Sequence, residues 1–103
     1  SRQQAEQFIE LGFKIGVGGS ITYERAKKTR EAISDIPLES LVLETDAPAM
    51  PLSGYQGVVN EPSRLRMVFD TLVGLRRESV GTIESQLWNN TIELFEGKRV
   101  KQD

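Results

Sequence analysis

Two strand-like segments separated by a helical segment constrain the fold of this chain more than any other feature. Residues 13–17 alternate apolar and polar side chains, and residues 38–46 contain a short apolar run that Pro48 and Pro51 stop. Strands that alternate with helices pair in parallel through right-handed crossovers. Because two parallel strands are marginal alone and parallel sheets are covered on both faces, the order predicts a slice of a larger α/β fold.

Four helical segments accompany the two strands. Residues 2–11 have helical apolar spacing and end at Gly12, and Thr22 is a predicted N-cap for a helix reaching about Ser34. A long loop, residues 47–61, precedes a helix that begins near Pro62, and a last helix spans residues 81–95. The helical spacing predicts that one apolar stripe of the last helix is core, and that basic residues on the other helices form solvated faces. The stripe is Trp88, Leu94 and Phe95, and the basic residues are Lys27, Lys28, Arg30, Arg76 and Arg77.

Composition and charge exclude several classes of protein. The chain of 103 residues is 38% hydrophobic and 27% charged, which argues against disorder, and its net charge of -2 gives no general attraction for a polyanion. No apolar run approaches the roughly 18 residues of a membrane span, so no membrane association is expected and a cytoplasmic setting is the default expectation. The first residue is Ser1 instead of Met, which suggests a fragment or a processed product.

Two carboxylates close the second strand and are the main candidates for chemistry. Glu44 and Asp46 are two residues apart, so on a strand they share a face with Val42, while Leu41 and Leu43 face the other way. A buried carboxylate costs several kcal/mol unless a cation or a set of donors meets it, so a positive partner is expected at this strand end. That partner is either a metal ion or a Lys or Arg side chain. With no His and no Cys, a metal site made by this chain alone would be oxygen-only.

The sequence around these acids resembles a known family. The run Leu-Val-Leu-Glu-Thr-Asp-Ala-Pro at 41–48, the Asn-Glu-Pro at 60–62 and the Asn90-Thr91 pair with Leu94-Phe95 are similar to the C-terminal pattern of the TatD-family metal-dependent deoxyribonucleases. The Gly-Tyr-Gln-Gly loop at 54–57 and residues 13–20 are most similar to the YjjV-type branch. The resemblance implies a TIM-type (β/α)₈ barrel, which typically needs about 250 residues. Residues 1–103 would then be a single partial domain: the C-terminal part of the barrel, with its last two βα units and terminal helices.

The same resemblance implies a site shared with earlier strands that carry metal-binding histidines and a glutamate. Asp46 is carried over as metal ligand and catalytic residue, and Glu44 matches the neighbouring acid that lines the barrel or supports the ligands. The implied cofactor is a divalent cation, Mg, Mn or Zn, and the implied substrate is DNA or another phosphoester bound by the complete barrel.

Four further residues are candidates for substrate binding. Gly19 and Ser20 follow the first strand, where barrel loops often bind phosphate, although the glycines also suit close packing. Tyr55 in the long loop suits stacking on a base, and Asn60 lies in the Asn-Glu-Pro motif.

Three functions remain open at this point. The first is a phosphoester hydrolase whose isolated C-terminal part is inactive and needs the missing N-terminal portion. The second is a non-enzymatic barrel module that self-associates or binds a partner through exposed strand edges. The third is a metal-dependent amide hydrolase of a related barrel type.

Overall fold

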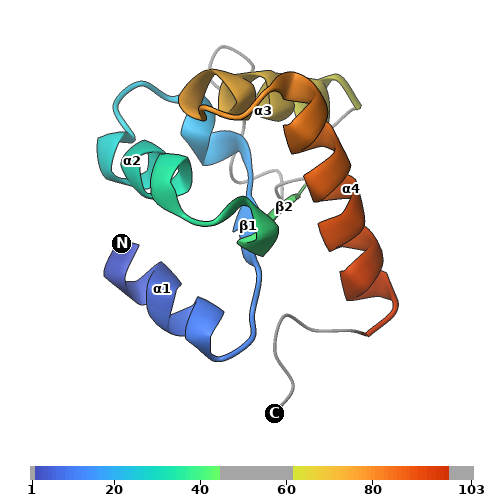
Figure 1. The fold of residues 1–103 in the computed structure, drawn as a ribbon. Helices are drawn as coiled ribbons and strands as arrows, with labels where there is room; N and C mark the ends of the chain where they lie inside the picture. Colours follow the sequence, from blue (N-terminus) through green and yellow to red (C-terminus); the bar gives the residue numbers. More distant parts are fainter. Residues whose placement is uncertain (1, 45–61, 98–103) are drawn as a thin grey trace.

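The structure is a computed structural model that describes residues 2–44 and 62–97. Within them the chain forms α1 (Arg2–Glu10), β1 (Ile15–Val17), the 3₁₀-helix η1 (Gly19–Thr22), α2 (Lys27–Asp35), the 3₁₀-helix η2 (Leu38–Ser40), β2 (Leu41–Leu43), α3 (Pro62–Leu75) and α4 (Val80–Phe95). β1 and β2 pair in parallel, with Ile15 opposite Leu41 and Val17 opposite Leu43. Figure 1 shows α1 and α2 to one side of the strands, α4 to the other and α3 beyond one end. The predicted α/β order and parallel pairing are confirmed.

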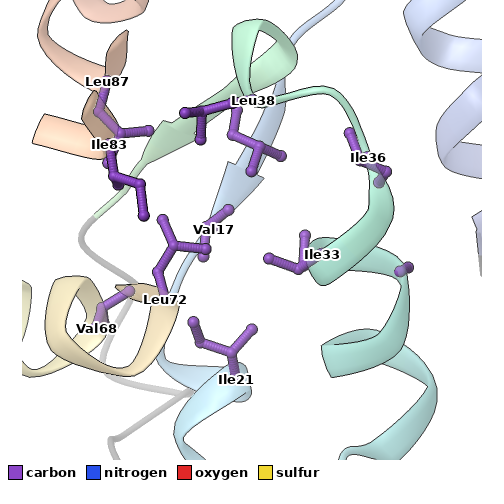
Figure 2. Close-up of a cluster of buried hydrophobic side chains, with 11 residues drawn as sticks. Val17, Ile21, Ile33, Ile36, Leu38, Val68, Leu72, Ile83 and Leu87 are labelled. Atoms are coloured by element: carbon purple, nitrogen blue, oxygen red, sulfur yellow. The ribbon is translucent and has the colours of Figure 1, made fainter. Parts of the chain in front are cut away.

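The core lies between the two strands and the helices that cover one of their faces. Val17 and Leu41 are 1% and 0% exposed, and Leu72 of α3 and Ile83 of α4 are fully buried. Figure 2 shows these helices and α2 directing aliphatic side chains toward the strands. Each large aliphatic side chain that is fully buried contributes roughly 1.5–3 kcal/mol of hydrophobic stabilisation. The full cluster is Val17, Ile21, Ala32, Ile33, Ile36, Leu38, Leu41, Val68, Leu72, Ile83 and Leu87.

The predicted alternation of β2 is confirmed as far as Glu44. Leu41 is buried in the core and Leu43 packs against it, whereas Val42 is half-buried and Glu44 is exposed. One face of the two-stranded sheet is therefore covered by helices, and the other is open within the described residues.

Two sequence-based boundaries are wrong. The second strand was predicted over residues 38–46, but residues 38–40 form η2, and residues 45–61 lie outside the described part of the chain. Thr22 does not cap a helix: it ends η1, and its Oγ1 donates to the Gly19 carbonyl at 2.6 Å. α2 begins only at Lys27, after Ala26. α2 thus begins five residues beyond Thr22, whereas an N-cap side chain accepts from an amide only two or three residues ahead of it.

The prediction that Trp88, Leu94 and Phe95 of α4 belong to the core is also wrong. Trp88 is 66% exposed, Leu94 44% and Phe95 85%. The buried residues of α4 are instead Ile83, Leu87 and Asn90, which recur at intervals of four and three residues. α4 has apolar side chains on two neighbouring faces, and only contact with β2 and η2 decides which one is covered.

Arg76 is not the solvated side chain that its sequence context predicted. Its side chain is 6% exposed and forms an ion pair with Glu78, with 2.9 Å between Nη2 and Oε2. Its Nη1 also donates to the carbonyls of Ile33 and Ile36 at the end of α2. These are carbonyls that the helix itself leaves without an intrahelical partner.

The Arg76 hydrogen bonds, with smaller electrostatic help from Arg77, lower the pKa of the Glu78 carboxyl from 4.5 to about 2, against a desolvation that raises it. The ion pair therefore stabilises the fold above about pH 4.5 and is lost as the pH falls toward 2.

The other basic residues that were predicted to form solvated faces also differ in exposure. Lys27, Lys28 and Arg77 are exposed as predicted. Arg30 is half-buried and donates from Nε to the Ile21 carbonyl at 2.8 Å, so it ties α2 to η1.

None of the helices in the described ranges has the length and apolar character needed to cross a bilayer.

Candidate functional site

The carboxyl ends of β1 and β2 meet at one edge of the sheet because the strands are parallel. The ladder extends one residue beyond β2, where the Glu44 amide donates to the Val17 carbonyl at 2.9 Å. η1 follows β1 directly at this edge and packs against α3. Ligands of open parallel sheets and barrels bind beyond the carboxyl ends of the strands. This edge is therefore the candidate site.

Glu44 lies on the open face of the sheet and folds back across β1. A Cβ atom built on Gly16 would fall 2.7 Å from both the Cδ and the Oε1 of Glu44. The absence of a side chain at Gly16 thus makes room for the Glu44 carboxylate. Sequence reasoning missed this contact between Gly16 and Glu44, although a glycine inside a strand signals the close approach of another group.

The sequence predicted a positive partner for the acids, but among the described residues no Lys or Arg side chain forms an ion pair with Glu44. Glu44 is exposed, and no ion pair within residues 2–44 and 62–97 includes it. The prediction assumed burial of the strand end, but an open face leaves this carboxylate in water, where it needs no partner.

Gly19 and Ser20 form the start of η1. Gly19 is buried and Ser20 half-buried, and the Ile21 amide donates to the Gly18 carbonyl at 3.3 Å. Together with the bond from Thr22 to Gly19, this closes a tight turn beneath α3. The geometry supports packing as the role of these glycines, and phosphate binding by Gly19 or Ser20 stays a prediction.

Asp46, Tyr55 and Asn60 lie outside the described residues, and their predicted roles stay predictions. In the part of the chain that the structure describes, no three His, Cys, Asp or Glu residues come close enough to hold a metal ion. Glu44 on the open face fits a contribution to an oxygen-rich metal site, but the described residues do not fit a complete one.

Arg64 is a buried cation that sequence reasoning did not single out. It lies in the first turn of α3 and is only 4% exposed. Its position four residues before Val68, which itself precedes Leu72 by four, places it on the buried face of the helix. That spacing was the available signal, because a cation on an apolar face is seldom buried without a reason.

The geometry of the described residues identifies the class of fold. Parallel strands joined by a helical crossover, with helices on one face and an acid at the carboxyl edge of the other, form a section of a TIM-barrel-type α/β fold. The family model described as "TatD related DNase" matches residues 1–96. The chain belongs to the TatD family, and the predicted resemblance is confirmed.

Individual relatives agree with this assignment. The chain is 58% identical over 95 residues to the "Uncharacterized metal-dependent hydrolase YjjV" of Escherichia coli and 52% identical to an "Uncharacterized metal-dependent hydrolase" of Haemophilus influenzae. Each alignment covers 92% of this chain but only 37% and 36% of the relative. The crystal structure of YjjV, a TatD homologue from Escherichia coli, superposes with a TM-score of 0.87 at 57% identity, covering 93% of this chain and 37% of that one. The chain therefore spans little more than a third of the proteins it matches.

Substitution of Gly16 tests the contact with Glu44. In Gly16→Ala, the new methyl group would overlap the Glu44 carboxyl, so we expect that side chain to rotate away while the free energy of unfolding changes by less than about 1 kcal/mol. Carboxyl-carbon NMR shifts of Glu44 measure the movement, and denaturant unfolding measures the stability. Gly81→Ala is the matched control, because a Cβ there meets nothing within 4 Å. An unmoved Glu44 signal in Gly16→Ala would contradict the contact.

Proposed function

We propose that this chain is the C-terminal part of a metal-dependent hydrolase that cleaves phosphoester bonds of DNA, with activity that requires the complete barrel. The family description and the metal-dependent hydrolase names of the relatives support the class of reaction. The single observation that carries the proposal is the position of Glu44 on the open face, at the carboxyl edge of β2. Strand alternation then leads us to expect Asp46 on the same side, which is the interior of a closed barrel.

The two acids have different proposed roles. Asp46 would be a ligand of the cation and would accept a proton from the attacking water. Glu44, held across Gly16, would orient the groups around the site. A divalent cation would polarise the phosphoryl oxygen and make the attacking water a better nucleophile. The oxygen donors of this chain suit Mg or Mn, and Zn would need nitrogen ligands from other strands.

The decisive experiment compares this chain with a barrel hybrid, defined as the chain fused to the part of Escherichia coli YjjV that lies outside the matched region. We expect the hybrid to cleave a DNA duplex in the presence of Mg²⁺, Mn²⁺ or Zn²⁺, and EDTA to abolish the cleavage. The chain alone should show negligible turnover, since its described residues hold no complete metal site. Robust cleavage by the chain alone, or a folded hybrid that hydrolyses a cyclic amide but not DNA, would overturn the proposal.

A further inference from the structure

The segment that joins η1 to α2 concentrates positive charge near the carboxyl edge of the sheet. Residues 23–28, here called the basic strip, hold three of the 13 Lys and Arg residues of the chain but only one of its 15 acids, Glu24. The three cations, Arg25, Lys27 and Lys28, are exposed. Figure 1 shows the chain passing from β1 through η1 into this segment and then into α2, so the strip adjoins the edge that forms the candidate site.

Hydrogen bonds fix the backbone of the basic strip at both ends. The Tyr23 amide donates to the Ser20 carbonyl at 3.3 Å, and the Ala26 amide donates to the Tyr23 carbonyl at 3.1 Å. The bond from Arg30 to the Ile21 carbonyl holds the start of α2 against η1. A surface whose backbone is already ordered loses little conformational entropy when it binds a ligand.

Arg25 is oriented by an aromatic ring instead of an acid. Its Cζ lies 4.4 Å from the centroid of the Tyr23 ring, which is a cation–π contact. Stacking engages the face of the guanidinium plane, so the N–H groups at its edge can still form the paired hydrogen bonds with which Arg recognises a phosphate. The contact therefore suits Arg25 to binding an anion.

Cations elsewhere in the chain are balanced by acids in a way that the basic strip is not. At the other end of the sheet, where α2 leads into β2, Arg76 forms an ion pair with Glu78. Within residues 2–44 and 62–97, no ion pair includes a residue of the strip, Glu24 included. A run of surface cations is usually only a solvated face. This run, however, adjoins the candidate site and carries a net positive charge in a chain whose net charge is -2.

We propose that the basic strip binds the phosphate backbone of DNA beyond the bond that is cleaved. Because the net charge of the chain gives no general attraction for a polyanion, its attraction for DNA has to come from a local positive surface. Arg25 would hold one phosphate by paired hydrogen bonds, and Lys27 and Lys28 would attract the neighbouring phosphates. Such contacts position DNA without reading its sequence. This inference rests on the proposed function, because it names how the substrate of the same site is held.

Binding is measured with the chain in EDTA, so that no metal-dependent cleavage takes place. The probe is a short fluorescein-labelled DNA duplex, whose anisotropy is titrated at several salt concentrations. We expect Arg25→Gln and Lys28→Gln each to weaken binding by about threefold or more and to lower the slope of log affinity against log salt by about one. The losses should be the same for duplexes of different base sequence.

Arg77→Gln is the matched control. It removes the same charge from an exposed Arg beside Ser34 and Asp35, at the far end of α2 from the basic strip. It should change the affinity by less than about twofold, because salt screens charges separated by more than about 8 Å. Equal losses in Arg25→Gln and Arg77→Gln would overturn the inference, since only net charge would then matter. Displacement of the probe by polyglutamate as effectively as by unlabelled duplex would also overturn it, because the strip would then suit an acidic polypeptide.

The barrel hybrid supplies a second readout. We expect Arg25→Gln to raise its KM for the DNA duplex by about tenfold, and to raise the KM for bis(p-nitrophenyl) phosphate, which has a single phosphate, much less. If the chain alone binds the duplex too weakly to measure, the hybrid is titrated in EDTA instead, and an unchanged affinity in Arg25→Gln would overturn the inference. Binding that depends on the strip, without cleavage by the hybrid, would defeat only the proposed function. Cleavage of DNA that does not depend on the strip would defeat only this inference.

Discussion

Replacement of Asp46 by Asn in the barrel hybrid should lower the rate of DNA cleavage by more than about 100-fold, because groups that merely support metal ligands already contribute about 10–100-fold. The amide keeps the size of the side chain but removes the negative charge that would hold the cation and accept a proton. Initial rates at saturating metal measure the effect. A calorimetric metal titration supplies a second readout that does not depend on catalysis, and it should show weaker binding.

Two matched variants make the result specific. Glu44→Gln should reduce the rate by about 10–100-fold, as expected for a group that orients ligands without holding the metal. Glu39→Gln should leave the rate unchanged, because Glu39 is an exposed acid in η2, just before β2, at the opposite end of the strand. An Asp46→Asn hybrid that retains both its rate and its metal affinity would remove Asp46 from the site and leave the fold assignment intact.

Replacement of Asn90 by Leu should reduce the free energy of unfolding by about 1–3 kcal/mol, the usual cost of a buried carbonyl that loses its donor, since the Leu38 carbonyl still accepts from the Leu41 amide. Asn90 is 1% exposed, and its Nδ2 donates to the carbonyls of Leu38 and Leu41 at 2.9 and 2.7 Å. Its Oδ1 accepts from Nε2 of Gln86 at 2.8 Å. Leu has a similar size but cannot donate, so the two carbonyls that join η2 to β2 would lose this donor.

Urea unfolding of the chain measures this loss. Asn89→Leu is the matched control, because Asn89 is exposed on the same helix and its replacement should change stability by less than about 0.5 kcal/mol. Equal stabilities of the two variants would show that Asn90 does not hold α4 to the strand.

Several features of the candidate site could be predicted from the sequence alone. The alternation in residues 41–44 predicts the opposite faces of Leu41 and Glu44 because successive side chains of a strand point to opposite sides, and the structure confirms it. The contact between Gly16 and Glu44 could not be predicted, since it joins residues 28 positions apart in the chain through the parallel register of β1 and β2. Asp46, the residue on which the proposed chemistry depends, is supported by its sequence context and by the orientation of Glu44.

What the sequence determined by itself is the order of helices and strands, their parallel pairing and membership of the TatD family, because periodicity and motifs act over a few neighbouring residues. Tertiary structure alone decided that Trp88 of α4 is left exposed while other apolar residues of the helix are covered, and that Arg76 binds the end of α2 instead of water. In both cases the sequence permits more than one environment for a side chain. The choice is made by whichever distant element packs against it, and local spacing carries no information about that element.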